Sequence, residues 1–252
     1  MFDARLYPAG LSDADLQTLR YFAISHALAV ALPPPPPVTP ASIAAQHDDL
    51  LKVQLPRLQK EGLQAWAAVG VSARALPRRG LTEVLTALPA LLRHPRAKVI
   101  GPLELWRGGE AEEEAFLEQL KLARQLRLPV WVVASSDATT RRALQLLKGA
   151  RVEPKSVLFD GATVSTVKLI RACGYTASLC IHPDGVTAEE AVSVVKKLGA
   201  EGLALSTGAG LGATDLLGLA RAAHLLEKAG LSRAVVARVT LENAAALLCA
   251  DV

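Results

Sequence analysis

Cysteine is scarce in this sequence, and its spacing excludes a disulfide-stabilised fold. Cys173, Cys180 and Cys249 are the three cysteines among 252 residues, an odd number that cannot all pair within one chain. No two of them have the Cys-x-x-Cys spacing of redox or zinc sites. We therefore expect a protein of a reducing compartment, the cytoplasm, whose core forms without covalent staples.

Long uncharged apolar runs are also absent, although 51% of the residues are hydrophobic. The longest nearly uncharged stretch extends from Tyr21 to Val38, and it contains His26 and the proline run Pro33–Pro37. A membrane-spanning helix needs about twenty consecutive apolar residues, so no membrane segment is expected. The N-terminal residues lack the apolar core of a secretory signal, and none is expected there.

The sequence has no block of one charge sign. Its 28 Lys and Arg and its 24 Asp and Glu are interspersed, and the net charge is +4. Aromatic residues make up 4% of the chain and form no platform interleaved with basic residues. Nucleic acid is therefore not expected as a partner.

A glycine-rich turn is missing after the first predicted strand, which argues against a doubly wound, nucleotide-binding sheet. Instead, short apolar runs alternate with longer amphipathic stretches along the whole chain. Strands are predicted at Met1–Leu6, His26–Ala31, Gln64–Val71, Lys98–Leu105, Pro129–Ala134, Ser156–Asp160, Thr176–Ile181 and Gly202–Ser206. Eight strands separated by helices in about 250 residues predict a single (β/α)8 TIM barrel. No linker divides the chain, so one domain is expected over residues 1–252.

The intervening segments have helical patterns. Glu110–Arg127 begins with acidic residues and ends with basic ones, as the helix dipole favours. Thr187–Leu198 gathers its apolar residues on one face. A shorter helix is predicted after Ser12, ending near Tyr21.

The proline run Pro33–Pro37 follows the second predicted strand. We interpret it as a rigid loop on the face where barrels carry their active-site loops. The alternative is a docking segment for an SH3-like domain of an unknown protein partner.

Short phrases along the chain follow one another in a recognisable order. They are Phe2–Tyr7, Gly10–Tyr21, Val99–Leu103, Leu128–Val133, Ser156–Gly161, Gly174–Tyr175 with Ile181–Pro183, Leu205–Gly210 and Glu242–Asn243. In this order they resemble the TatD-related branch of the metal-dependent hydrolases, within the amidohydrolase-like barrel superfamily. The resemblance extends over nearly the whole chain, and it implies a TIM barrel that descends from a metal-dependent hydrolase.

The same resemblance places the family's metal ligands on residues of other kinds. The histidines of the opening motif correspond to Arg5 and Tyr7, the glutamate to Pro102, the later histidines to Val133 and Gly161, and the eighth-strand aspartate to Thr207. A catalytic divalent metal needs three or more nitrogen or oxygen ligands. Of the histidines, only His182 is expected to face the pocket. We therefore expect no metal, no cofactor and no catalytic residue.

Residues 3, 5 and 7 share one face of a regular strand, because side chains alternate. If that face points inward, Asp3, Arg5 and Tyr7 form a column at the barrel axis. The Arg5 guanidinium is then expected to pair with Asp3, Glu104 or Asp160. Two interpretations stay open: an ion pair that only keeps the mouth folded, or a pocket for a small anion. In the second, Tyr7 and Thr207 supply hydroxyl groups.

These expectations give one main functional hypothesis and one alternative. The main hypothesis is a non-catalytic TatD-like pseudo-hydrolase that acts as a binding, regulatory or scaffolding protein, with an unknown protein partner or a small anionic ligand. Its candidate pocket residues are Asp3, Arg5, Tyr7, Glu104, Asp160, His182 and Thr207. The alternative is an active TatD-type metal-dependent hydrolase of phosphoester or amide bonds.

Overall fold

The computed structural model describes residues 1–134, 136–183 and 185–248. Its strands form one eight-stranded parallel sheet in the order of the chain. They are β1 (Phe2–Leu6), β2 (His26–Val30), β3 (Gln64–Val69), β4 (Ala97–Leu105), β5 (Val130–Ala134), β6 (Val157–Asp160), β7 (Thr176–Cys180) and β8 (Leu203–Ser206). Each lies within two residues of its predicted bounds. The prediction of a (β/α)8 TIM barrel is confirmed.

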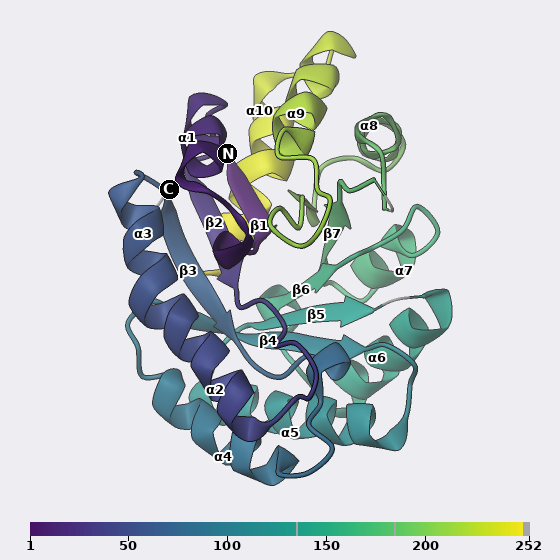
Figure 1. The fold of residues 1–252 in the computed structure, drawn as a ribbon. Coiled ribbons are helices and arrows are strands. Elements are labelled where there is room, and N and C mark those ends of the chain that lie inside the picture. Colours follow the sequence, from purple (N-terminus) through teal and green to yellow (C-terminus); the bar gives the residue numbers. More distant parts are fainter. Residues whose placement is uncertain (135, 184, 249–252) are drawn as a thin grey trace.

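Helices connect the strands and lie outside them (Figure 1). They are α1 (Asp13–Tyr21), α2 (Pro40–Asp49), α3 (Leu55–Lys60), α4 (Leu81–Leu91), α5 (Glu110–Leu126), α6 (Asp137–Gly149), α7 (Val167–Ala172), α8 (Ala188–Leu198), α9 (Gly218–Lys228), α10 (Arg233–Ala237) and α11 (Asn243–Leu247). A π-helical turn joins α2 to α3 at Leu50–Gln54, and another joins α10 to α11 at Arg238–Glu242.

The predicted helix starts are confirmed by their caps. The Ser12 hydroxyl accepts the Asp15 N–H at the start of α1, and the Thr187 hydroxyl accepts the Glu190 N–H at the start of α8. In both helices, the backbone N–H of the cap residue donates in turn to the carboxylate of the third helical residue. The two hydrogen bonds satisfy two N–H groups that have no partner within the helix.

The barrel closes between β1 and the segment that directly follows β8. The Tyr7 N–H donates to the Ala209 carbonyl at 2.8 Å, and the Gly208 N–H donates to the Arg5 carbonyl at 3.0 Å. Gly210 allows this approach, because a β carbon there would lie 2.0 Å from the Tyr7 carbonyl oxygen. Its φ of +91° also disfavours any other residue. The first strand was expected to pair with the eighth. The hydrogen bonds that close the barrel instead join β1 to the residues that directly follow β8.

Buried apolar side chains form one layer inside the barrel and one between strands and helices. The inner layer includes Phe2, Leu28, Val99, Trp131 and Leu158, and it is joined by Ala244, Ala245 and Leu247 from α11. Asn243 anchors α11 to the start of β8 by donating to the Ala200 and Leu203 carbonyls at 2.7 Å. Helix α11 therefore covers the N-terminal end of the barrel, and the C-terminal ends of the strands form the mouth.

The proline run lies in the loop between β2 and α2, as predicted. Pro34 is buried, whereas Pro33 and Pro35–Pro37 are exposed. The loop therefore has one side packed against the barrel and one side open to solvent.

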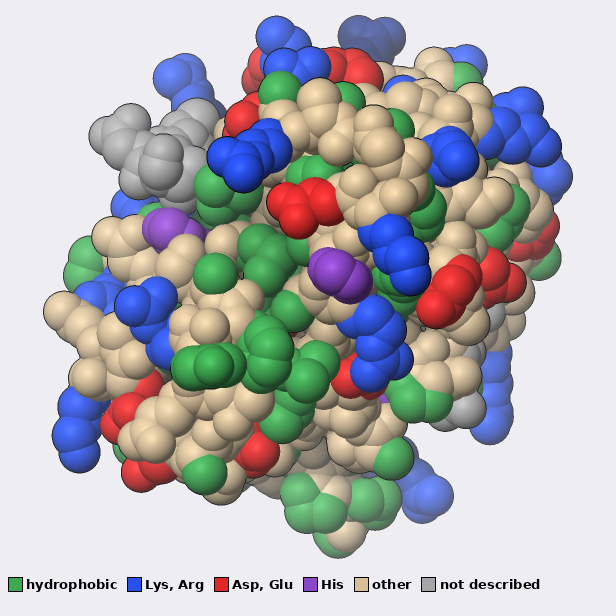
Figure 2. Space-filling model, turned by 90° about the horizontal axis from the view of Figure 1, so that it is seen from above, with side chains coloured by type: hydrophobic (Ala, Val, Ile, Leu, Met, Phe, Trp, Pro, Cys, Tyr) green, Lys and Arg blue, Asp and Glu red, His purple; other side chains and the backbone are tan. Residues whose placement is uncertain are grey.

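The described surface carries mixed charge. On the face seen in Figure 2, Lys and Arg side chains are scattered among Asp and Glu side chains and form no continuous stripe. Among the described helices, none combines the length and the apolar character needed to cross a membrane.

Candidate functional site

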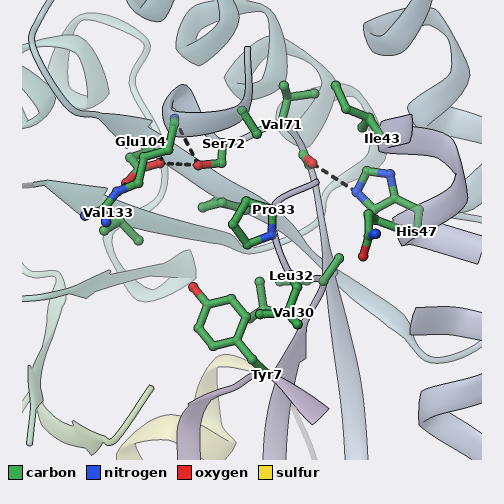
Figure 3. A pocket seen from close by; sticks show the side chains of 18 of the residues that line it. Tyr7, Val30, Leu32, Pro33, Ile43, His47, Val71, Ser72, Glu104 and Val133 are labelled. Carbon is green, nitrogen blue, oxygen red and sulfur yellow. Dashed lines mark hydrogen bonds and ion pairs between the residues drawn. The ribbon is translucent and has the colours of Figure 1, made fainter. Parts of the chain in front are cut away.

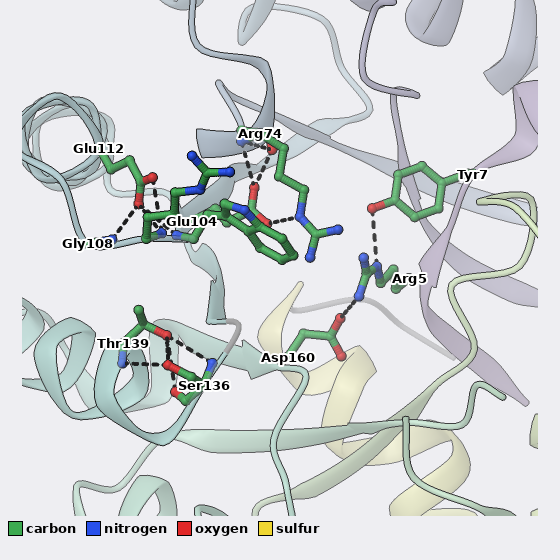
Figure 4. A network of polar contacts seen from close by, with 12 residues as sticks. Arg5, Tyr7, Arg74, Glu104, Gly108, Glu112, Ser136, Thr139 and Asp160 are labelled. Atoms are coloured by element: carbon green, nitrogen blue, oxygen red, sulfur yellow. Dashed lines mark hydrogen bonds and ion pairs between the residues drawn. The ribbon is translucent and has the colours of Figure 1, made fainter. Parts of the chain in front are cut away.

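Two charged side chains meet across the mouth of the barrel. Arg5 Nη1 donates to Asp160 Oδ2 at 3.3 Å, and Arg5 Nε donates to the Tyr7 hydroxyl at 3.2 Å (Figure 4). Strands β1 and β6 are not neighbours in the sheet, so the ion pair spans the mouth. The Arg5 side chain is 13% exposed and the Asp160 side chain is fully buried. The expected pairing of Arg5 with one of three carboxylates is confirmed for Asp160.

Asp160 is held in place by serines from the next strands. Ser206 Oγ donates to Asp160 Oδ1 at 2.7 Å, and Ser178 Oγ donates to Ser206 Oγ at 3.2 Å. All three side chains are fully buried. This chain of hydrogen bonds fixes the carboxylate that faces Arg5.

The Asp3 carboxylate belongs to the seam between β1 and β8. It accepts the Thr207 backbone N–H at 3.0 Å, the Thr207 hydroxyl, and the Arg5 backbone N–H at 3.1 Å. The register of β1 shifts between Asp3 and Leu6, so the side chains do not alternate strictly there. The predicted column is therefore wrong at Asp3, while Arg5 and Tyr7 do lie together. The Thr207 hydroxyl is engaged by Asp3.

Burial shapes the protonation of this cluster. It raises the pKa of Asp3 from 3.8 to about 6, although the hydrogen bonds from Thr207 and Arg5 oppose that rise. Burial also raises the pKa of Tyr7, so its phenol keeps its proton at neutral pH. For Arg5, burial opposes the charge, but the facing Tyr7 and Asp160 outweigh it and raise the pKa. Arg5 is thus a fixed cation.

Glu104, another of the three carboxylates considered for Arg5, pairs with Arg74. Arg74 Nε donates to Glu104 Oε1 at 2.8 Å, and the Ser72 hydroxyl donates to the same carboxylate (Figure 4). The Arg74 guanidinium also stacks 3.7 Å from the centre of the Trp106 ring. The loop after β3 brings Arg74 to Glu104 at the end of β4. No sequence motif predicted this contact between a loop and a strand.

A cavity lies beside Arg5, between the ends of β2, β3 and β4 (Figure 3). Its wall is mainly apolar and includes Val30, Leu32, Pro33, Ile43, Val71 and Val133. Arg5, Tyr7, Glu104 and Trp131 supply polar groups along the same wall. Pro34 lines the cavity as well, so the start of the proline loop covers part of it.

His47 also borders this cavity, which corrects the expectation that only His182 faces the pocket. His47 belongs to α2, and its Nε2 donates to the carbonyl of Gly70, directly after β3, at 3.0 Å. Burial lowers the pKa of His47, so its ring is neutral at physiological pH. The histidine therefore fixes α2 to the loop after β3.

A wider depression lies on the other side of Arg5. His182, Cys180 and Gly208 line it together with Arg5. Burial raises the pKa of the Cys180 thiol to about 12, so it is not a thiolate nucleophile at neutral pH. Of the predicted pocket residues, the structure places Arg5, Tyr7, Glu104 and His182 on the walls of the mouth. It buries Asp3, Asp160 and Thr207 beneath them.

The positions at which the resemblance places metal ligands do not fit a divalent cation. Arg5 projects a permanent positive charge into the mouth, and Pro102, Val133 and Gly161 carry no side-chain donor. Within residues 1–134, 136–183 and 185–248, no three His, Cys, Asp or Glu side chains are grouped to hold a metal ion. A divalent centre needs at least three such ligands, and these residues do not supply them.

Comparisons with known proteins extend over the full length of the chain. No protein-family model matches it. It is similar to an uncharacterized metal-dependent hydrolase of Methanocaldococcus jannaschii, 25% identical over 250 residues, which cover 97% of this chain and 98% of the relative. The TatD-like protein from Archaeoglobus fulgidus superposes with a TM-score of 0.82 at 20% identity, covering 99% and 100% of the two chains. A TatD homologue from Escherichia coli gives 0.72 at 18% identity, covering 100% and 98%.

Proposed function

We propose that this chain, which is similar to a metal-dependent hydrolase in sequence and to TatD-like proteins in fold, is a non-catalytic relative of them whose barrel mouth binds a small ligand. Such a protein keeps the barrel and the mouth of a hydrolase and replaces the metal cation by a protein cation. The free thiols of Cys173 and Cys180 support a place in the cytoplasm.

One observation carries this proposal: the Arg5 guanidinium lies in the mouth and is paired with Asp160. A divalent cation there would lie close to a fixed positive charge, and the Asp160 carboxylate that faces this position is already neutralised by Arg5. In metal-dependent hydrolysis, the bound metal lowers the pKa of the attacking water. Pro33 lies on the cavity wall and Pro34 is buried, which supports a role of the proline loop in closing the mouth.

The first test measures metal and hydrolysis on untagged protein. After incubation with Zn²⁺ or Mn²⁺ and desalting, elemental analysis should find well under one equivalent of metal. Turnover of bis(p-nitrophenyl) phosphate and of DNA should stay at background with either ion. Tightly held stoichiometric metal, together with cleavage that disappears in Asp160→Ala, would instead identify an active hydrolase.

A second test restores two of the missing ligands. The double variant Arg5→His/Tyr7→His should still bind no Zn²⁺ in a calorimetric titration, because Pro102, Val133 and Gly161 leave the other ligand positions empty of donors. Tyr7→His alone is the matched control, since it adds one imidazole and keeps the Arg5 charge. Strong Zn²⁺ binding by the double variant only would mean that further ligands are present in the mouth.

A further inference from the structure

The indole N–H of Trp131 lies buried in the mouth without a hydrogen-bond partner. Among the described residues it is the buried side-chain nitrogen or oxygen atom for which none is found. Trp131 is fully buried and lines the cavity beside Arg5. Buried polar groups in folded proteins nearly always have a partner, and an indole N–H can only donate. A ligand acceptor in the cavity would complete this group.

The Tyr7 hydroxyl is a second donor on the same wall. It accepts from Arg5 Nε at 3.2 Å, and within the described chain no acceptor receives its own proton. It points into the cavity between Pro33 and Val133 (Figure 3). The Tyr7 hydroxyl, directly after β1, therefore faces this space, and Trp131 from β5 lines it, while the remaining wall is mainly apolar.

The charged groups at the cavity are already compensated. Arg5 pairs with Asp160 at 3.3 Å, and Arg74 pairs with Glu104 at 2.8 Å. A charged ligand would lose its hydration and would meet groups that have partners, which is unfavourable in a partly buried site. An uncharged ligand avoids this cost and still uses both free donors.

We propose that this cavity binds a compact, uncharged and mainly apolar carbonyl compound, whose oxygen accepts hydrogen bonds from Trp131 Nε1 and Tyr7 Oη. The inference rests on the proposed function, because it takes the mouth to be a binding site and not a hydrolytic one. Apolar pockets with a few placed polar groups are typical of small-molecule sites.

Three probes of similar size test the ligand class: cyclohexanone, methylenecyclohexane, in which a CH2 group replaces the oxygen, and cyclohexanecarboxylate. Binding is followed in ¹H–¹⁵N spectra through the indole N–H signals of Trp66, Trp106 and Trp131, assigned with Trp→Phe variants. Cyclohexanone should bind saturably and move the Trp131 indole proton downfield, as a new hydrogen bond does. Methylenecyclohexane should bind about tenfold more weakly, since it offers no acceptor.

Substitutions separate the hydrogen bond from packing. Trp131→Phe should weaken cyclohexanone about tenfold and leave methylenecyclohexane nearly unchanged. Trp66→Phe is the matched control, because Trp66 stacks on Phe2 with ring centres 5.9 Å apart and does not line the cavity. It should change neither affinity. Tyr7→Phe should reproduce the effect of Trp131→Phe, so the conclusion does not depend on one variant folding well.

Three results would overturn the inference. Equal affinity for cyclohexanone and methylenecyclohexane would mean that the donors hold no ligand. Tighter binding of cyclohexanecarboxylate would assign the pocket to an anion held by Arg5. Failure of all three probes to bind would remove this ligand class altogether. Each leaves the proposed function standing, because that proposal is decided separately by metal content and hydrolysis.

Discussion

Arg5→Ala is expected to destabilise the protein by about 3–5 kcal/mol, because it leaves the fully buried Asp160 carboxylate without its cation. Ser206 still donates to Asp160, but a neutral hydroxyl cannot replace a guanidinium. For a barrel of this size, the loss should lower the melting temperature by roughly 6–20 °C. Thermal and urea unfolding followed by circular dichroism measure both quantities.

Two controls separate charge from packing. Arg142→Ala removes an arginine that pairs with Glu113 on the exposed surface, and it should leave the melting temperature close to that of the wild type. The double variant Arg5→Ala/Asp160→Asn should be more stable than Arg5→Ala alone, since no unpaired charge remains buried. An Arg5→Ala variant as stable as the wild type would contradict the buried ion pair.

The second large effect is on the pH dependence of stability, through Asp3. Its pKa of about 6 in the folded state exceeds its ordinary value of 3.8. Between these values the folded protein holds a proton that the unfolded chain has lost, so this carboxyl reduces stability as the pH rises. This difference in pKa corresponds to a decrease of about 3 kcal/mol in the free energy of unfolding from pH 4 to above pH 6.

Asp3→Asn should abolish this loss and make the protein more stable than the wild type at pH 7, with little difference at pH 4. The amide keeps an oxygen for the Thr207 N–H, which Asp3 accepts at 3.0 Å. His47 acts in the opposite direction, because burial lowers its pKa and its neutral form is favoured as the pH rises. Comparing variant with wild type at each pH therefore isolates Asp3.

Glu118→Gln is the matched control for this pH series, since Glu118 is half exposed on α5 beside Lys121. It should retain the wild-type dependence of the unfolding free energy on pH. If Asp3→Asn has the same pH profile as the wild type, Asp3 is ionised in the fold throughout this range.

The barrel could be read from the sequence because its signals are local. Each strand is a short apolar run between polar turns, and each helix has an apolar face and a cap such as Ser12 or Thr187. Eight such repeats in about 250 residues leave few architectures other than the TIM barrel. The substitutions of the expected metal ligands, in contrast, were implied residue by residue by the resemblance to the TatD-related family.

The partners of the polar groups could not be read locally. Period-two alternation predicted Asp3 beside Arg5 and Tyr7. The register of β1 against β2 instead shifts between Asp3 and Leu6, and Asp3 accepts hydrogen bonds from Thr207. Glu104 forms its ion pair with Arg74, because the loop after β3 reaches the end of β4. Both interactions join segments that are far apart in the chain.

Periodicity, caps and composition thus determined the fold class and the order of the strands, whereas the missing metal donors were an implication of the family resemblance. Only the tertiary structure decided that Arg5 pairs with Asp160, that His47 reaches the mouth, and that the Trp131 N–H is buried without a partner. The physical reason is that hydrophobic pattern is a property of neighbouring residues. The partners of charged and hydrogen-bonding groups, in contrast, come from strands and loops that are distant in the sequence and meet only in the folded protein.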